Sequence, residues 1–125
     1  MPKTAAEMVA EAKTRTESLT AEQVAAERDA GRALVVDIRD ADQRANDGAI
    51  PGAIHASRGM LEFYADPSSP YHRPEFDPTS RVILHCASGG RSALAADTLK
   101  QLGYTNVAHL DGGFKAWKDA GKPTE

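Results

Sequence analysis

The chain has 125 residues, which is enough for one domain with a single core. Hydrophobic residues make up 41% of it, charged residues 26%, and the formal net charge is -3, a balance that excludes an intrinsically disordered chain. With 15 basic and 18 acidic residues and no basic block, we expect neither nucleic acid nor membrane as a partner. No apolar stretch approaches the roughly 20 residues that cross a bilayer, and no apolar signal core follows Met1, so we expect no secretion by that route.

Cys86 is the only cysteine, so it cannot close an internal disulfide, and we expect a reducing, cytoplasmic location. The four histidines are too far apart in sequence for a metal-binding helix or finger. We therefore predict no bound metal, and we expect no cofactor.

Two helices are predicted in the N-terminal quarter of the chain. Apolar residues at helical spacing form one face of the segment 4–16, namely Ala5, Met8, Val9 and Ala12. That face would pack on its own domain or across a two-fold axis in a homodimer, while Glu11 and Arg15 pair on the opposite side. A capping box at residues 20–23 starts the second helix, which should end just before Gly31.

Three short apolar runs are typical of strands buried on both faces of a parallel sheet: residues 33–37, 81–85 and 106–110. A helical pattern at 92–102 lies between the second and the third run, so these elements form a βαβ unit. A last helix is predicted over residues 114–120.

The middle of the chain is less regular. Turn residues at 47–52 precede a brief strand at 53–55 and one or two helical turns at 59–64. Residues 66–80 contain four prolines, which forbid a regular element. A loop of this length in a compact domain is usually functional or a lid.

The most informative segment is 82–92, which reads Val-Ile-Leu-His-Cys-Ala-Ser-Gly-Gly-Arg-Ser. An apolar strand delivers Cys86 at its carboxyl end, the edge at which open α/β sheets bind ligands. We expect Gly89 and Gly90 to adopt left-handed dihedral angles, so that main-chain N–H groups surround an anion. The next helix terminus and the charge of Arg91 add to this field, which favours a nucleophilic thiolate over the alternative, an inert core cysteine.

Four segments in this order resemble the single-domain rhodanese family: residues 34–39, 48–54, 86–91 and 110–117. Together they span nearly everything except the first helix. The resemblance implies a three-layer α/β fold, with a central parallel sheet of about five strands flanked by helices. The rhodanese-like domain would cover residues 18–125, preceded by an additional N-terminal helix within residues 1–17.

The resemblance further implies sulfur transfer that needs no cofactor. The Cys86 thiolate would attack the outer sulfur of thiosulfate or a related donor, release sulfite and keep a persulfide. A thiophilic acceptor such as cyanide or a thiol would then remove the sulfur. The expected partners are thus small sulfur-containing anions and thiols, with a protein sulfur acceptor as a further option. Substrate binding would fall to the residues that follow the nucleophile, which are Ala87, Ser88, Gly89, Gly90, Arg91 and Ser92.

Two alternatives stay open. One is a persulfide carrier or protein-recognition module with little turnover. The other is a phosphatase or arsenate reductase of the same fold, whose active-site loops hold seven residues. The loop from Cys86 to Arg91 holds six, a ring that suits one sulfur atom better than a tetrahedral phosphate. The solitary cysteine also disfavours arsenate reduction with an internal resolving thiol.

Residues around the loop are expected to support it. Asp37 and Arg39 match the family's Asp-x-Arg after a buried strand, and we expect a structural salt bridge rather than a catalytic pair. His85 should face away from the nucleophile, because neighbouring strand residues alternate between the two faces. Residues 111–113 should form a turn that caps the last helix, and Trp117 should pack in the core.

A pocket rim that recognises an anionic donor is predicted from the middle of the chain. Its candidate residues are Arg58, Tyr64, Tyr71, His72 and Arg73. The alternative is that these side chains are ordinary solvated loop residues.

Overall fold

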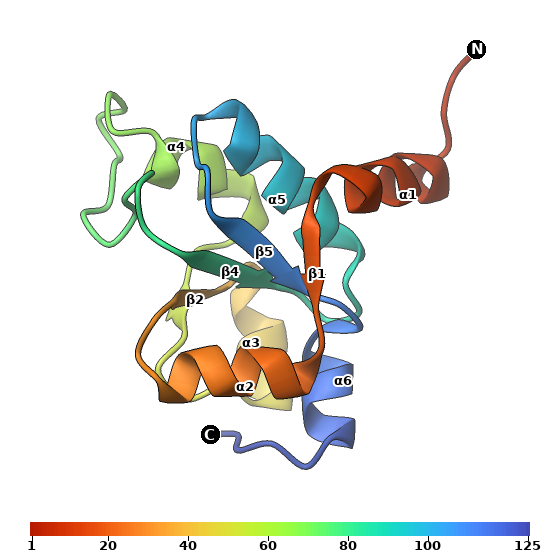
Figure 1. Ribbon diagram of the computed structural model, residues 1–125, viewed down its shortest axis with the longest axis vertical. Helices are drawn as coiled ribbons and strands as arrows, with labels where there is room; N and C mark the ends of the chain where they lie inside the picture. The colour runs from red at the N-terminus through yellow and green to blue at the C-terminus, as the bar shows by residue number, and fades with distance from the viewer.

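The computed structural model describes residues 1–125 as one five-stranded parallel sheet with helices on both faces (Figure 1). The strands are β1 (Glu17–Leu19), β2 (Leu34–Asp37), β3 (Ile54–His55), β4 (Val82–His85) and β5 (Val107–Leu110). The helices are α1 (Ala5–Arg15), α2 (Ala21–Asp29), α3 (Ala41–Asp47), the 3₁₀ turn η1 (Arg58–Met60), α4 (Leu61–Ala65), α5 (Gly90–Gln101) and α6 (Gly113–Asp119). The predicted α/β class and the parallel sheet of about five strands are confirmed.

The strand order β1-β5-β4-β2-β3 places β4 at the centre of the sheet. Every neighbouring pair is parallel, so all carboxyl ends meet at one edge. β4 is fully buried along its length, which agrees with its continuous apolar sequence. Cys86 therefore follows the central strand at the middle of the edge where ligands bind in such sheets.

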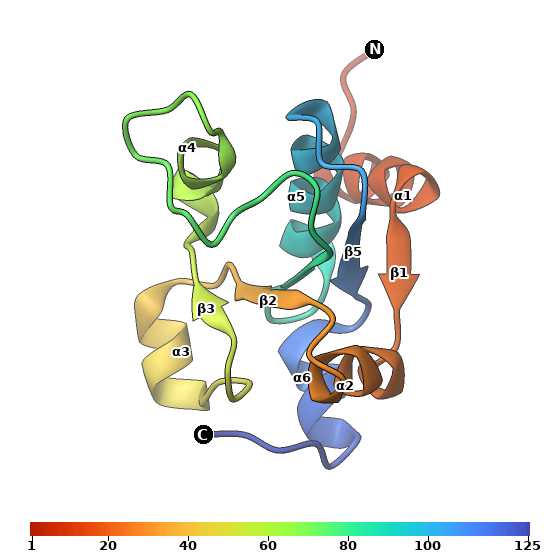
Figure 2. The same ribbon diagram turned by 60° about the vertical axis from the view of Figure 1, so that its left-hand side comes forward.

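The two faces of the sheet carry separate cores. Helices α1, α4 and α5 lie on one face, and α2, α3 and α6 lie on the other (Figures 1 and 2). The first core includes Leu84 and Cys86, and the second includes Ile83 and Trp117. Trp117 is fully buried and donates its indole N–H to the carbonyl of Pro123, which confirms its predicted core position. None of the helices combines the length and the apolar content that a bilayer crossing requires.

Two elements have no counterpart among the sequence predictions. β1 is three residues long and buries only Leu19, so its alternation is too short to recognise. α3 buries no residue at all, and a helix without an apolar face has no hydrophobic periodicity. Because β1 begins at Glu17, the predicted domain boundary after residue 17 falls inside this strand.

α1 begins at a capping box on Thr4 and packs against α5 of its own chain. Of its four predicted apolar-face residues, only Ala12 is fully buried, while the Met8 side chain is 49% exposed. The predicted pairing of Glu11 with Arg15 is wrong. Arg15 instead makes a bidentate contact with Asp97 of α5, and this geometry outweighs a single contact along one helix.

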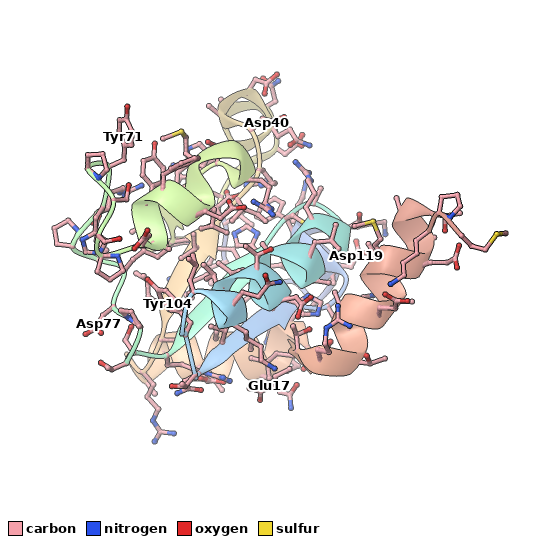
Figure 3. All side chains as sticks on the ribbon, turned by 90° about the horizontal axis from the view of Figure 1, so that it is seen from above. Glu17, Asp40, Tyr71, Asp77, Tyr104 and Asp119 are labelled. Atoms are coloured by element: carbon pink, nitrogen blue, oxygen red, sulfur yellow. The ribbon has the colours of Figure 1, made fainter.

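The proline-rich segment 66–80 has no helix or strand, as predicted. It is nevertheless ordered, because Phe76 is buried in the first core. The Tyr104 hydroxyl donates to the carbonyl of Ala65 at 2.7 Å, which fixes the start of the loop. Figure 3 shows Tyr71 at the outside of this loop, on the opposite side of the molecule from α1.

Candidate active site

The active-site loop, defined here as residues 86–92, connects β4 to α5. Gly89 occupies the N-cap of α5 with φ +107°, a left-handed angle that favours glycine. A Cβ atom at Gly89 would also lie 3.1 Å from the main-chain nitrogen of Gly112, so two separate constraints select glycine here. Gly90, by contrast, is the first ordinary helical residue. The prediction that both glycines adopt left-handed angles is therefore wrong for Gly90, because a single reversal suffices to start the helix.

Main-chain N–H groups converge on the Cys86 sulfur. The nitrogens of Gly89 and Ser92 lie 3.1 and 3.4 Å from Sγ, and the Ser92 hydroxyl lies 3.6 Å away. These N–H groups belong to the first turn of α5, where a helix leaves its donors without internal partners. Cys86 itself is only 1% exposed. The sulfur thus occupies a site built to hold negative charge, although it also borders the apolar core.

The remaining loop residues differ in what they present. Ser88 is exposed, and Ala87 is half-buried. The Arg91 guanidinium donates to the side-chain oxygen of Gln43 in α3 at 3.2 Å and makes no hydrogen bond to the sulfur. Arg91 therefore ties the loop to α3, and its charge acts on the sulfur only from a distance.

The start of α6 supports the loop from behind. Phe114 and Lys115 donate their main-chain N–H groups to the carbonyls of Cys86 and Ala87 at 2.8 and 3.1 Å. Gly113 has φ +63°, and a Cβ there would lie 2.6–2.7 Å from those same carbonyl groups. Sequence reasoning identified the glycine turn as a helix cap, and Gly112 is indeed the N-cap of α6. It missed that the second glycine is needed for backbone-to-backbone contact with the loop.

Asp37 and Arg39 form a fully buried ion pair at 2.7 Å beside the loop, the arrangement that we expected. The Arg39 guanidinium also donates to the carbonyl of Gly48 and lies 4.3 Å from the Phe114 ring centroid. Burial pushes the pKa of Asp37 upward, but the hydrogen bonds from Arg39 and the nearby positive charges outweigh it and hold that pKa below its usual range. The pair stays charged and fixes the segment after β2 against α6.

His85 lies on the face of the sheet opposite to the Cys86 side chain. Its ring stacks on Phe114, and its Nε2 lies 3.9 Å from an Asp37 oxygen without a hydrogen-bond partner. Burial lowers the pKa of His85 to about 4, which the neighbouring carboxylate only partly offsets. His85 is therefore neutral near pH 7, and nothing places it against the sulfur.

The predicted rim residues are engaged with partners away from the active-site loop. Arg58 pairs with Glu62 at 2.7 Å, and His72 Nε2 contacts the carbonyl of Phe76. Arg73, in the proline-rich loop, lies over the ring of Tyr64 and donates to the carbonyl of His55. None of these side chains has a hydrogen bond or ion pair with the active-site loop.

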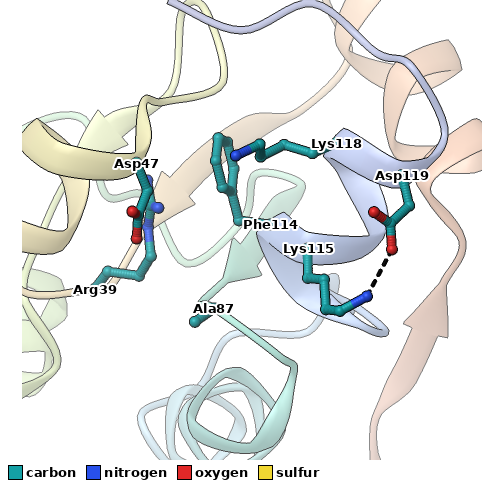
Figure 4. A pocket seen from close by; sticks show the side chains of 7 residues that line it. All are labelled: Arg39, Asp47, Ala87, Phe114, Lys115, Lys118 and Asp119. Carbon is teal, nitrogen blue, oxygen red and sulfur yellow. Dashed lines mark hydrogen bonds and ion pairs between the residues drawn. The ribbon is translucent and has the colours of Figure 1, made fainter.

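A cavity of about 220 Å³ lies beside the loop, between α6 and the segment that follows β2 (Figure 4). Its lining comprises Arg39, Asp47, Ala87, Phe114, Lys115, Lys118 and Asp119. Lys115 is paired with Asp119 at 2.8 Å, whereas Lys118 has no carboxylate partner. Lys118 thus supplies the unpaired positive charge in the cavity next to the active-site loop.

Known proteins share the fold of this chain. The model of the rhodanese-like domain family matches residues 20–120. A Rhodopseudomonas palustris protein of unknown function, called a possible tyrosine phosphatase, is 44% identical with a TM-score of 0.92, covering 100% of this chain and 99% of that one. A thiosulfate sulfurtransferase from Pseudomonas aeruginosa is 33% identical with a TM-score of 0.77, covering 97% of this chain and 22% of that one. A rhodanese-related protein from Thermoplasma volcanium, at 24% identity and a TM-score of 0.71, shares the fold over 87% of this chain and 97% of its own.

The family match contains β2 to β5, the active-site loop and α6. The match to the Pseudomonas protein covers 97% of this chain and so extends beyond residues 20–120. The chain corresponds to only about a fifth of that longer protein. On the match across residues 20–120, this chain belongs to the rhodanese-like domain family, a family of sulfurtransferase-type enzymes.

Proposed function

We propose that this protein is a sulfurtransferase that carries a sulfane sulfur as a persulfide on Cys86. The observation that carries the proposal is the pair of main-chain N–H groups directed at Sγ from the first turn of α5. Such donors stabilise a thiolate before the reaction and a persulfide anion after it, without having to reorganise. The similarity to a thiosulfate sulfurtransferase over 97% of the chain supports the same reaction class.

The first half-reaction makes the persulfide. The Cys86 thiolate attacks the outer sulfur of thiosulfate, the sulfur–sulfur bond of the donor breaks, and sulfite leaves with the bonding electron pair. In the second half-reaction a thiophilic acceptor such as cyanide attacks the outer sulfur of the persulfide. Thiocyanate leaves, and the electron pair returns to Cys86 as a thiolate. No electrons are gained or lost by the protein over the cycle.

A phosphatase is the second candidate, because the Rhodopseudomonas protein that is 44% identical is called a possible tyrosine phosphatase. The six-residue length of the loop from Cys86 to Arg91 distinguishes the two reactions on geometric grounds. The main-chain N–H groups of Gly89 and Ser92 point at a single sulfur atom, and the Arg91 guanidinium is hydrogen-bonded to Gln43. A phosphate ester needs a wider ring and an arginine that contacts its oxygens. These features favour sulfur transfer.

The test is a pair of steady-state assays on the same preparation, one for thiocyanate formation from thiosulfate and cyanide and one for hydrolysis of p-nitrophenyl phosphate. We expect thiocyanate formation that disappears in Cys86→Ser, and no Cys86-dependent phosphate release. Hydrolysis of p-nitrophenyl phosphate without thiocyanate formation would contradict the sulfurtransferase and indicate a phosphatase. A persulfide that forms without turnover would indicate the carrier instead.

A further inference from the structure

A chain of polar side chains runs from the buried sulfur to the protein surface. Cys86 Sγ lies 3.6 Å from the Ser92 hydroxyl, and Ser92 Oγ lies 3.2 Å from His109 Nδ1. His109 Nε2 in turn lies 2.9 Å from the Ser18 hydroxyl. The sulfurtransfer chemistry described above uses neither His109 nor Ser18.

The fold brings these four residues together from four elements. Cys86 follows β4, Ser92 lies in the first turn of α5, and His109 and Ser18 are direct partners in the register of β5 and β1. Ser92 and His109 are fully buried, whereas Ser18 is exposed. The hydrogen-bonded chain therefore connects a sulfur that solvent scarcely reaches to a hydroxyl at the surface.

His109 has the charge state that proton passage requires. Burial lowers its pKa, Asp111 partly offsets this, and Lys13 adds to the lowering. These are the charged groups that face it, one beyond the end of its own strand and one from α1, and they pair with each other at 3.2 Å. The facing groups from α5 and β1 are uncharged hydroxyls, and β4 presents Leu84. The imidazole is therefore neutral at pH 7, with one N–H and one lone pair.

Two hydrogen-bond arrangements connect all four groups, and in each of them the Ser92 hydroxyl gives up the bond that it can donate to the carbonyl of Gly89 at 3.2 Å. With a thiol, the S–H donates to Ser92, the Ser92 O–H donates to Nδ1 of His109, and the Nε2–H donates to Ser18. With a thiolate every bond reverses: the Ser18 O–H donates to Nε2, the Nδ1–H donates to Ser92, and the Ser92 O–H donates to the sulfur. The second arrangement contains one proton fewer than the first, and that proton has left from the Ser18 hydroxyl.

We propose that Ser92, His109 and Ser18 form a relay through which the Cys86 proton passes to solvent and which then orients the Ser92 hydroxyl toward the thiolate. The atoms balance: each group accepts one proton and gives one up, the Cys86 S–H bond breaks, and water takes the final proton. Ser18 and His109 act through Ser92 and are positioning residues. The inference rests on the proposed role of Cys86 as the nucleophile.

The test is the rate of alkylation of Cys86 by iodoacetamide as a function of pH, which needs no sulfur donor. Because Cys86 is the only cysteine, the loss of free thiol reports on it alone. We expect Ser18→Ala to slow alkylation at pH 7 by about fivefold and to move the midpoint of the pH–rate curve upward, since one neutral hydrogen bond is lost. Ser18→Thr, which keeps the hydroxyl, should restore the wild-type curve. Ser80→Ala removes a hydroxyl outside the relay, one that donates to the carbonyl of Asp77, and should match the wild type.

His109→Asn should have the larger effect, about tenfold or more, because it removes the group that connects both hydroxyls. If this buried substitution unfolds the protein, the two variants at exposed Ser18, Ser18→Ala and Ser18→Thr, still test the relay. The relay is overturned if the Ser18→Ala curve coincides with those of the wild type and Ser80→Ala. Persulfide formation with unchanged alkylation curves would remove the relay and keep the sulfurtransferase. Shifted alkylation curves without sulfur transfer would keep the relay and remove the sulfurtransferase.

Discussion

The active-site loop and the proline-rich loop 66–80 are both irregular and both ordered, yet they are held in opposite ways. The active-site loop is held by backbone hydrogen bonds: main-chain N–H groups at the start of α5 bind the sulfur, and those of α6 bind the loop carbonyls. The proline-rich loop has backbone turns of its own, but side chains also bind its backbone to the rest of the fold, as when Arg73 donates to the carbonyl of His55 at 2.6 Å. Backbone donors without other partners remain available to an anion, whereas side-chain charges used for fixing a loop do not.

The backbone contacts of the active-site loop predict that the start of α6 behind it is sensitive to a single added carbon. Gly113→Ala places a Cβ within 2.6 Å of the Ala87 carbonyl and imposes an unfavourable φ, so we expect a loss of more than about 3 kcal/mol of stability or failure to fold. Gly121→Ala is the matched control, since Gly121 has φ +72° but nothing within 4 Å of its added Cβ. It should cost only about 1–2 kcal/mol.

Urea denaturation measures both variants. Equal losses in Gly113→Ala and Gly121→Ala would mean that the contact between α6 and the loop backbone is unimportant, and the comparison of the two loops would fail.

The sheet beneath the active-site loop is expected to lose stability in acid. The pKa of His85 is about 4 in the folded state, below its ordinary value of 6.5, so between these values the unfolded chain binds a proton that the folded protein does not. Stability should therefore fall as the pH drops from 6.5 to 4, by about 3 kcal/mol for this group. Urea denaturation at pH 7 and pH 4 should show a steep loss for the wild type and a shallower one for His85→Gln. Equal slopes would exclude His85 as the cause.

The proline-rich loop should respond to Arg73→Ala in stability and not in catalysis. Removing the hydrogen bond to the His55 carbonyl should cost about 2 kcal/mol, because a charged donor is involved. The guanidinium is also paired with Glu75 at 3.0 Å, so we expect the KM for thiosulfate to stay unchanged. Arg58→Ala, which loses only a pair along one helical segment, should cost less than about 0.5 kcal/mol. A raised KM in either variant would restore the predicted pocket rim.

An effect smaller than that of Arg73→Ala is expected at the cavity beside the active-site loop. Lys118→Ala removes the unpaired cation of that cavity, and we expect the KM for thiosulfate to rise by up to about fivefold at low salt with little change in kcat. Lys122→Ala, which changes the net charge equally but removes a lysine paired with Glu22, is the control. An unchanged KM in Lys118→Ala would show that the donor does not approach through this cavity.

The sequence was most informative where backbone conformation and burial are encoded locally. The continuous apolar runs at β2, β4 and β5 identify a parallel sheet, and the glycines after Cys86 indicate a loop that binds an anion. Such patterns depend on neighbours in the chain. They place Cys86 at the edge of the sheet where the strands have their carboxyl ends.

The contacts made over long distances in the sequence were not predictable in this way. Ser18 and His109 are 91 residues apart, and only the pairing of β1 with β5 makes them neighbours. Gly113 reads as an ordinary turn residue until the loop carbonyls behind it are seen. The direction of Arg91, toward Gln43 rather than the sulfur, likewise depends on where α3 packs.

The most direct test of the account is the intact mass of the protein after incubation with thiosulfate and removal of excess donor. We predict that the wild type gains about 32 Da, the mass of one sulfur atom, and that cyanide removes it again. Cys86→Ser should show no gain. A wild-type protein that remains at its original mass, or a Cys86→Ser variant that gains the same sulfur, would contradict the assignment of Cys86 as the sulfur carrier.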